Sequence, residues 1–348
     1  MNLPRNTTQI KLAGTETFRA ASAALFGLFG SNLQNIPKNM RGMYWADDGK
    51  VLVQCDQSGA EALIVAYLCE PGRFRDLFLH GVKPHVFVAM NVFLEKWQIL
   101  CKDINVNDFV STPIPELKKK QGWEILRSII SESDNWAPSE RYYYIAKMIC
   151  HAANYGMKAA AFQLNVLQKS EGQIVLTKSQ AEDYLIRYHS LFPELHRWHR
   201  WVEEQLRFAG MLYNMHGFPR VVSGRMPTEK DYKEWYAFAP QSTVGCITHI
   251  ACERFQSYID EHNRDWDLLN NCHDSYLAQC PQGEELEMAK VMKDFIEQDL
   301  TSFRGEKFKM RSECQIGRNW GVRKEKRDDA GNVIKVINPE GLVEVKLN

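Results

Sequence analysis

Two aspartates lie where the sequence predicts that strands end. Asp56 follows VLVQC, an apolar run typical of a buried strand, and a helical pattern begins near Glu61. Asp274 lies near the turn of WDLLNNCHDSYLAQCP, residues 266–281, whose two strand-like halves predict a hairpin. Two such carboxylates could converge on one edge of a sheet. At about 4 Å apart they would repel by roughly 4 kcal/mol at an effective dielectric near 20.

A bound cation would remove that repulsion. Carboxylates with open positions beside them suit Mg²⁺, which binds a few carboxylates together with substrate phosphates. Two such ions would activate an attacking hydroxyl and stabilise a leaving oxygen. The alternative is that each aspartate only caps a turn, as isolated aspartates often do. Spacing alone leaves both interpretations open.

A second pattern lies on the helix predicted for residues 141–156. Lys147, His151 and Tyr155 follow one another at intervals of four, so they fall within about 80° of arc on one face. A cation and two flat rings could bind the phosphates and the base or sugar of a nucleoside triphosphate. The alternative is a solvent-facing lysine beside two packed rings. The sequence contains no Gly-rich phosphate loop and no His-Glu-x-x-His or paired-cysteine metal motif.

Other patterns predict the elements around these residues. Residues 95–140 are polar and indicate a mixed loop and helix insertion. After Pro193, apolar residues at helical spacing predict a helix with a buried stripe. That stripe consists of Leu195, Trp198, Val202 and Leu206. The remaining predictions are a hairpin over residues 211–223, a long helix over 241–263 and a peripheral hairpin around 329–332.

Composition limits the class of protein. The 348 residues, 45% hydrophobic and 25% charged, suffice for one large or two moderate domains. Lys plus Arg equals Asp plus Glu at 43 each, so any nucleic-acid surface must be local. The nine cysteines include no Cys-x-x-Cys pair and indicate reduced, intracellular thiols. The N-terminus does not resemble a secretory signal and no apolar run could cross a bilayer, which predicts a soluble, cytoplasmic protein with no membrane contact.

Five stretches in order resemble the motifs of DNA polymerase I-like, family A enzymes. SNLQNIP, residues 31–37, resembles the segment before motif A, and CDQSGAEALIVAYL from Cys55 resembles motif A itself. The helix carrying Lys147 is similar to motif B, CHDSYL from Cys272 to motif C, and QIGRNWG, residues 315–321, to the C-terminal strand. Five ordered matches are far more specific than any one of them.

The resemblance implies an α+β, right-hand polymerase fold with an antiparallel palm sheet and helical fingers. The implied division is palm over residues 1–80, fingers over 81–207, palm again over 208–323 and a C-terminal hairpin or tail over 324–348. Only a short lead precedes Arg19, so the thumb is expected to be absent. With fewer phosphate contacts we expect low processivity.

The implied reaction is template-directed addition of deoxynucleotides to a primer 3′ end by two-metal nucleotidyl transfer. Asp56, Asp274 and the backbone carbonyl of Gln57 would hold two Mg²⁺ ions, for which Mn²⁺ could substitute. Lys147 would meet the triphosphate and protonate the departing pyrophosphate. The remaining implied contacts are Glu61 against a ribose 2′-hydroxyl, His151 against the incoming nucleotide, Tyr155 near the templating base, and Arg19, Gln34, Asn35, Gln241 and His273 on primer or template.

Some positions depart from the family pattern. The residue four before Lys147, usually arginine, is Tyr143, and the nearest arginine, Arg141, would face elsewhere on an ideal helix. His151 replaces the usual Phe or Tyr, and Ser275 replaces an acid that often follows the motif C aspartate. His-Asp-Ser is also similar to single-subunit phage-type RNA polymerases, whereas Glu61, SNLQNIP and QIGRNWG favour the DNA enzymes.

The expected partners are primer-template DNA and dNTPs, in a bacterial or phage-infected host cytoplasm. The chain resembles a phage-derived or split polymerase, for which a separate thumb or exonuclease chain, or a processivity factor, could complete the enzyme. Two alternatives stay open. One is an RNA-synthesising relative, and the other is a catalytically degenerate nucleic-acid-binding subunit.

Overall fold

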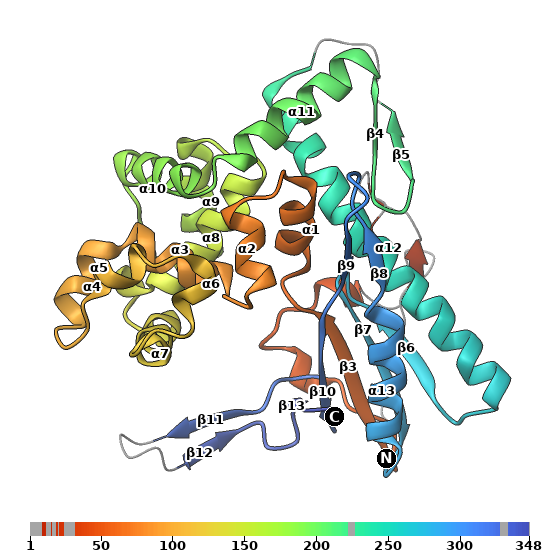
Figure 1. Cartoon of the computed structure of the whole chain (residues 1–348). Helices are drawn as coiled ribbons and strands as arrows, with labels where there is room; N and C mark the ends of the chain where they lie inside the picture. The colour runs from red at the N-terminus through yellow and green to blue at the C-terminus, as the bar shows by residue number, and fades with distance from the viewer. Residues whose placement is uncertain are drawn as a thin grey trace. The chain divides into compact units, whose positions relative to one another are not determined.

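The computed structural model describes residues 9–11, 15, 19, 21–23, 32–221, 227–327 and 333–347 (Figure 1). The chain forms two compact units. The first comprises Met1–Glu61, Asn214–Phe218 and Gln241–Asn348, and the second Ala62–Tyr213 and Pro219–Pro240. The division into palm and fingers that the sequence resemblance implies stays a prediction.

A five-stranded antiparallel sheet forms the centre of the first unit. Its strands are β3 (Lys50–Gln57), β6 (Asp267–Asn271), β7 (Ser275–Pro281), β10 (Ser312–Gly317) and β13 (Val343–Val345). They are ordered β13-β10-β3-β7-β6, and every neighbouring pair is antiparallel. The central strand β3 is covered on both faces, which explains its continuous apolar run. This antiparallel sheet and the helices of the second unit confirm the predicted α+β class.

Two helices cover one face of the sheet. They are α12 (Glu229–His262) and α13 (Glu285–Ile296), and Figure 1 shows α13 running along the sheet. The Tyr276 hydroxyl donates a hydrogen bond to the Met292 carbonyl of α13 at 2.6 Å. Gln57 Nε2 donates to the Val244 carbonyl of α12 at 3.1 Å. These helices therefore fix the strand ends at which the predicted aspartates lie.

The opposite face carries a small apolar cluster and then a polar row. The cluster consists of Leu52, Cys272, Leu277, Trp320 and Leu342, with Ile36, Tyr44 and Ala46 packed against it. Asp56 pairs with Ser275 on β7 and with Glu313 on β10. Residues directly opposite each other point to the same face. Asp56 therefore shares one face with Ser275 and Glu313, at the end of β3.

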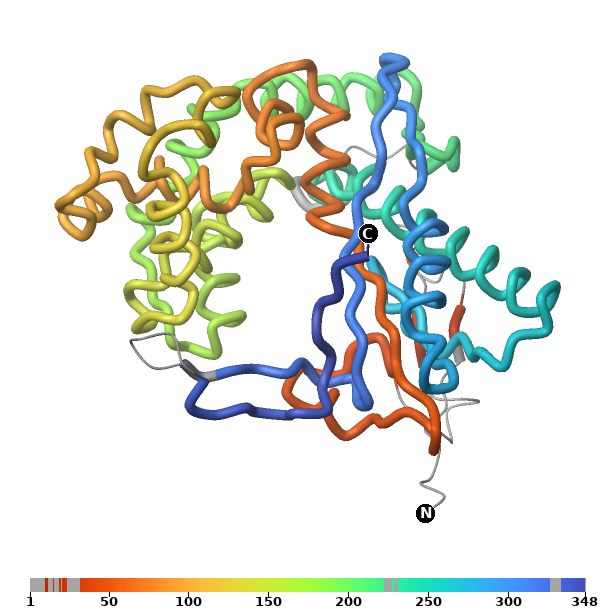
Figure 2. Tube along the Cα trace, turned by 60° about the horizontal axis from the view of Figure 1, so that its bottom comes forward, coloured from red at the N-terminus to blue at the C-terminus, as the bar shows by residue number. Residues whose placement is uncertain are grey.

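Shorter elements complete the first unit. They are β1 (Gln9–Lys11), β2 (Ala21–Ala23), η1 (Leu33–Asn35), η2 (Arg41–Met43), β8 (Asp299–Thr301), β9 (Lys307–Lys309), β11 (Lys324–Arg327) and β12 (Val333–Ile337). Strands β11 and β12 pair antiparallel, and their hairpin extends away from the sheet (Figure 2). The turn predicted around residues 329–332 lies outside the described residues.

The second unit is mainly helical. Its elements are α1 (Ala60–Leu68), which begins in the first unit, α2 (Arg73–Leu79), α3 (Pro84–Val92), α4 (Leu94–Leu100), α5 (Val106–Val110), α6 (Ile114–Leu117), α7 (Trp123–Glu132), η3 (Ser133–Asn135), η4 (Pro138–Glu140), α8 (Tyr142–Asn154), α9 (Ala159–Lys169), α10 (Lys178–Leu191), α11 (Glu194–Phe208), and the hairpin of β4 (Met211–Tyr213) with β5 (Pro219–Val221). Helix α10 begins at a capping box of Thr177 and Gln180. The stripe predicted after Pro193 is buried on α11, which confirms that prediction.

Two helix boundaries differ from the predictions. Helix α8 ends at Asn154 rather than at residue 156, because Gly156 has φ +65° and Tyr155 forms the cap. A Cβ at Gly156 would lie 2.8 Å from the Tyr236 ring, so this position favours glycine. Helix α12 begins at Glu229, earlier than the predicted residue 241, and continues through Pro240.

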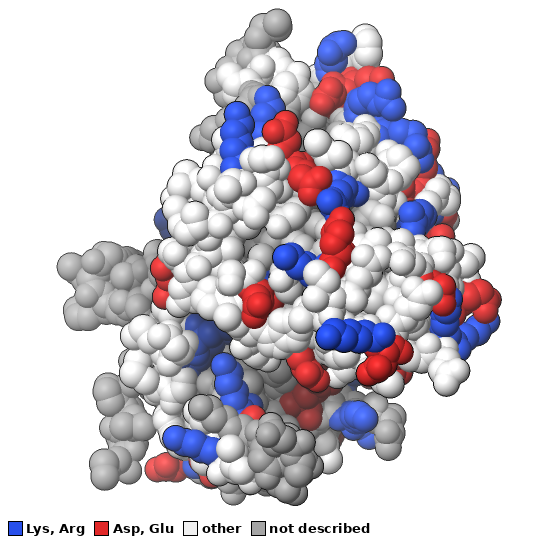
Figure 3. Space-filling view, turned by 90° about the vertical axis from the view of Figure 1, so that its left-hand side faces the viewer, with Lys and Arg blue, Asp and Glu red and all other residues white. Residues whose placement is uncertain are grey.

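On the face shown in Figure 3, the charges of the described residues are of both signs and interspersed, without a broad single-sign patch among them. None of the helices in the described part of the chain is both long and apolar enough to span a membrane.

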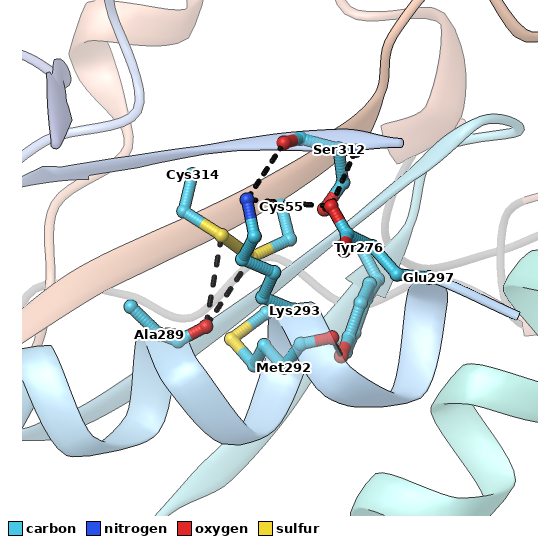
Figure 4. Close-up of a disulfide and its surroundings, with 8 residues drawn as sticks. All are labelled: Cys55, Tyr276, Ala289, Met292, Lys293, Glu297, Ser312 and Cys314. Atoms are coloured by element: carbon cyan, nitrogen blue, oxygen red, sulfur yellow. Dashed lines mark hydrogen bonds and ion pairs between the residues drawn. A yellow bond between two sulfur atoms is a disulfide. The ribbon is translucent and has the colours of Figure 1, made fainter. Parts of the chain in front are cut away.

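The structure contradicts the expectation of nine reduced cysteines. Cys55 on β3 and Cys314 on β10 are directly opposite in the sheet and form a disulfide (Figure 4). The Sγ atoms of both face the Ala289 carbonyl of α13. The other seven cysteines are free. The strand register, which cysteine spacing does not reveal, brings the two thiols together.

Reducing this disulfide should lower the free energy of unfolding by about 4 kcal/mol, because the bond closes a very long loop in the unfolded chain. Urea denaturation with and without reductant measures the difference, and a thiol titration should rise from seven to nine groups. Cys314→Ser should remove the response to reductant, while Cys280→Ser should keep it. Equal stability with and without reductant would contradict a Cys55–Cys314 bond.

Candidate active site

Asp56 and Asp274 meet at the end of the sheet. The backbone N–H of Gln57 donates to the Asp274 carbonyl at 2.9 Å, which joins the end of β3 to the turn before β7. Both carboxylates line a cavity of about 310 Å³ in the first unit. The structure therefore brings together the two aspartates that the sequence predicted at strand ends.

A tight turn presents Asp274. The N–H of Cys272 donates to the Ser275 carbonyl at 2.7 Å, and His273 has φ +70°, which is uncommon for a residue other than glycine. The buried Thr248 hydroxyl donates to the His273 carbonyl at 2.9 Å and accepts from Gln57 Nε2 at 2.8 Å. Thr248 thus ties both strand ends to α12, a role for which the sequence offers no signal.

The electrostatics of the pair favour a bound cation. Desolvation and then the charges of Asp274 and Glu313 raise the pKa of Asp56 to about 7. Desolvation also raises the pKa of Asp274, although this residue keeps an exposed surface, while nearby Arg19 lowers it. Among the described residues, no group of three or more His, Cys, Asp or Glu side chains is placed to hold a metal ion. The pair fits Mg²⁺ if other oxygens complete the coordination.

Sequence reasoning missed the basic side chains of this cavity. Lys38 and Arg41 line it and lower the pKa of Asp56. The Arg41 guanidinium lies 4.5 Å from the centroid of the Trp320 ring. Trp320 Nε1 in turn donates to Gln54 Oε1 at 2.7 Å, beside Asp56 on the sheet. The sequence could have indicated these residues, because Lys38 and Arg41 closely follow SNLQNIP and Trp320 lies within QIGRNWG.

The other predicted residues of the first unit have defined surroundings. Arg19 and Glu61 form an ion pair with both side chains partly buried. Gln34 is buried and donates to the Asn271 carbonyl at 2.8 Å, so it supports the strand before the motif C turn. Asn35 is exposed, and Gln241 is partly exposed. The pKa of His273 is lowered, chiefly by desolvation and then by Arg19.

The three residues predicted on the motif B helix belong to the second unit. Lys147 Nζ lies 3.0 Å from Asp134 Oδ2 and 4.4 Å from the centroid of the Tyr143 ring. His151 is exposed, and its ring meets the buried Tyr155 edge to face at 5.1 Å between centroids. The two rings therefore lie together, while the lysine is turned toward Asp134.

Arg141 does not follow the direction expected on an ideal helix. It precedes α8 as the N-cap, with φ −78° and ψ 59°, which is not helical. Its Nε donates to the Asp134 carbonyl at 2.8 Å. Arg141 and Lys147 therefore approach the same acidic residue, contrary to the expectation from helix geometry.

Known proteins resemble this chain over most of its length. The family model described as DNA polymerase family A matches residues 128–322. DNA polymerase I of Aquifex aeolicus (strain VF5) is 22% identical over 292 residues, which are 84% of this chain and 41% of that protein. DNA polymerase I of Caldicellulosiruptor bescii is 21% identical over 329 residues, 90% of this chain and 32% of that protein. The chain thus spans less than half the length of these relatives.

A solved structure shows the same fold. It is the POL domain of Pol1 from M. smegmatis in complex with DNA primer-template and dNTP, with a TM-score of 0.63 and 19% identity. The match covers 90% of this chain and 47% of that one, and it confirms the predicted polymerase fold. Since the family match spans more than half of the 348 residues, this chain belongs to DNA polymerase family A.

Proposed function

We propose that this chain catalyses template-directed DNA synthesis, adding deoxynucleotides to a primer 3′ end by two-metal nucleotidyl transfer. The observation that carries the proposal is the meeting of Asp56 and Asp274 at one cavity, in a chain of family A. Their mutual repulsion is a cost that a binding-only protein would have no reason to retain.

The aspartates are the proposed metal ligands, with the Gln57 carbonyl as a further ligand. These residues would hold Mg²⁺ or Mn²⁺, and the chemistry that such ions would supply is activation of the primer hydroxyl and stabilisation of the leaving oxygen. Asp56 lies on β3 and Asp274 on the turn before β7. The Gln57 N–H joins the two backbones by donating to the Asp274 carbonyl, and Thr248 links the Gln57 side chain to the His273 carbonyl. The chain thus positions the carboxylates through backbone contacts, before any substrate binds.

Other residues bind substrate in this proposal. Lys147 neutralises the triphosphate and protonates the departing pyrophosphate. Glu61, held by its ion pair with Arg19, excludes a ribose 2′-hydroxyl. His151 lies against the incoming nucleotide and Tyr155 near the templating base. The proposed contacts to primer or template are Arg19, Gln34, Asn35, Gln241 and His273. The M. smegmatis domain was solved with DNA primer-template and dNTP, which supports proposing the same partners here.

The direct test is extension of a labelled primer on a DNA template with Mg²⁺, comparing dNTPs with rNTPs. Wild-type protein should extend the primer with dNTPs only, and Asp274→Asn should abolish extension while leaving the fold intact. The matched control is Asp260→Asn, since Asp260 is an exposed acid on α12. Extension with rNTPs would instead favour an RNA-synthesising relative. No extension by a folded wild-type protein that still binds DNA would contradict the proposal and favour a binding subunit.

A further inference from the structure

The hairpin of β11 and β12 lies beyond the residues that the family model matches. That match ends at residue 322, and β11 begins at Lys324. The hairpin belongs to the first unit, which also contains Asp56 and Asp274. It extends away from the central sheet (Figure 2). The two-metal reaction proposed above gives this hairpin no role.

Tight packing fixes the base of the hairpin to the sheet. The side chains of the buried Asn319 and of Asn338 exchange two hydrogen bonds of 2.8 Å. Asn338 has φ +54°, a conformation that asparagine adopts more readily than most residues. A Cβ at Gly321 would lie 2.8 Å from the Gly42 Cα, so the two backbones are too close for a side chain between them. The hairpin therefore leaves the sheet from a packed base.

The base of the hairpin also forms part of the wall of the aspartate cavity. Val322 and Leu342 line the cavity together with Asp56 and Asp274. The same two residues form a bridge between the chain that enters the hairpin and the chain that leaves it. The Arg323 N–H donates to the Leu342 carbonyl at 3.0 Å. A molecule that reaches the aspartates therefore comes close to the base of the hairpin.

One face of the hairpin presents lysines to solvent. Lys324 is directly opposite Ile337, and Lys335 lies two residues before Ile337, so all three point to the same face. All three are exposed. Among the described residues, neither lysine has an ion-pair partner. We call this surface, formed by Lys324, Lys335 and Ile337, the lysine face.

Acidic residues in the hairpin reduce its positive charge but do not cancel it. Residues 323–337 contain five basic and three acidic residues, in a chain whose net charge is zero. Glu325 lies opposite Val336, on the face away from the lysines, and its carboxylate pairs with Arg323 at 3.1 Å. The other acidic residues in or directly after the hairpin are Asp328, Asp329, Glu340 and Glu344. The lysine face therefore carries positive charge, and Glu325 lies on the other face.

A ribbon with exposed lysines fits a DNA duplex. The major groove admits a two-stranded β-ribbon, and lysines bind the phosphates that border the groove. Protein interfaces depend instead on large aromatic anchors. Residues 323–337 contain no Phe, Trp or Tyr. Charge and composition thus favour a polyanionic partner over a protein.

We propose that the hairpin of β11 and β12 is a duplex-binding arm, whose Lys324 and Lys335 bind phosphates of the primer-template duplex beside the aspartate cavity. Primer-template DNA as the source of the phosphates rests on the function proposed above. The contact is electrostatic, so the arm holds the duplex without reading its sequence.

The double variant Lys324→Gln with Lys335→Gln should bind primer-template DNA about tenfold more weakly at about 0.1 M salt. The slope of log affinity against log salt concentration should also become shallower by about 2, because each lost phosphate contact removes about 0.9 from it. Lys324→Arg with Lys335→Arg keeps both charges and should bind within about twofold of wild type.

The measurement is fluorescence anisotropy of a labelled primer-template, over a series of salt concentrations and with a chelator that prevents synthesis. The matched control is Lys290→Gln with Lys307→Gln, since these are exposed lysines of the first unit, on α13 and β9. Its affinity should stay within about twofold of wild type. Circular dichroism checks that each variant folds.

Several results would overturn the inference. They are equal affinity in the glutamine variant and wild type, weaker binding with an unchanged salt slope, and no DNA binding by wild type. A concentration-dependent dimer that the glutamine variant loses, while its DNA binding is unchanged, would assign the hairpin to contact with a second copy of the chain instead.

These results are separable from those of primer extension. Wild type that binds the duplex through the two lysines but extends no primer would refute only the proposed synthesis. Wild type that extends primers while the glutamine variant binds DNA as wild type does would refute only the role of the hairpin.

Discussion

Asp56→Asn is expected to lower the rate of primer extension by at least about a thousandfold, since it removes one of the two carboxylates proposed to hold the metal ions. The same substitution should make the metal-free protein more stable. Asp56 is partly buried and faces Asp274 and Glu313, so its charged form is disfavoured in the folded protein. Asparagine has a similar shape and no charge.

The gain in stability should depend on pH in a defined direction. The folded-state pKa of Asp56 is raised to about 7, so the folded protein holds a proton that the unfolded chain has lost between about pH 4 and pH 7. The penalty is absent below that window and complete above it. At pH 8 we expect Asp56→Asn to be more stable by about 1 to 3 kcal/mol, and at pH 4 by almost nothing.

Urea denaturation in the presence of a chelator, at pH 8 and pH 4, measures this difference. Asp260→Asn provides the matched control, because Asp260 is exposed on α12 and should change neither stability nor activity. If Asp56→Asn extended primers at the wild-type rate, Asp56 would have no role in the reaction. A variant that is less stable than wild type at pH 8 would show that the Asp56 carboxylate stabilises the fold instead.

Local patterns were sufficient to place the two aspartates. The run VLVQC with the helix that follows it, and the two halves of residues 266–281, each encode an element within a few residues, and both elements form as predicted. These patterns left open whether the two carboxylates meet. They meet because β3 and β7, which are far apart in the sequence, are neighbouring antiparallel strands of the sheet. Only the position of each aspartate at the end of its own strand depends on short-range sequence.

Contacts between distant segments were not predictable in this way. Thr248 joins the two strand ends from the middle of α12, and Asp134 meets Lys147 only because η3 folds back onto α8. The pairing of Cys55 with Cys314 depends on the register between strands 259 residues apart. No periodicity reports such contacts, since each depends on how whole elements pack.

Three histidines of the second unit should make it sensitive to acid. Desolvation is the main cause that lowers the pKa of His85 to about 4, His189 to about 3 and His199 to about 4. Below an ordinary pKa near 6.5 the unfolded chain binds protons that the folded protein excludes. The stability that these groups contribute is therefore complete above about pH 6.5 and is lost as the pH falls toward 4.

Each such histidine adds a slope of about 1.4 kcal/mol per pH unit within this window. Together the three should cost several kcal/mol between pH 6.5 and pH 5, enough to remove much of the stability of a typical domain. Urea denaturation at pH 7, 6 and 5, monitored by tryptophan fluorescence, measures the slope of the unfolding free energy against pH directly.

His199→Gln is the variant that tests the cause. His199 Nε2 lies 2.8 Å from the Asn154 carbonyl at the end of α8, and its ring stacks on Tyr236 at 4.2 Å between centroids. Glutamine can keep the hydrogen bond but does not titrate. The slope of the unfolding free energy against pH should therefore fall by about 1.4 kcal/mol per pH unit, the contribution of one proton. His80→Gln, at an exposed position, should leave the slope unchanged. An unchanged slope in His199→Gln would mean that His199 is protonated in the folded protein, and that the carbonyl end of α8 tolerates a charged ring.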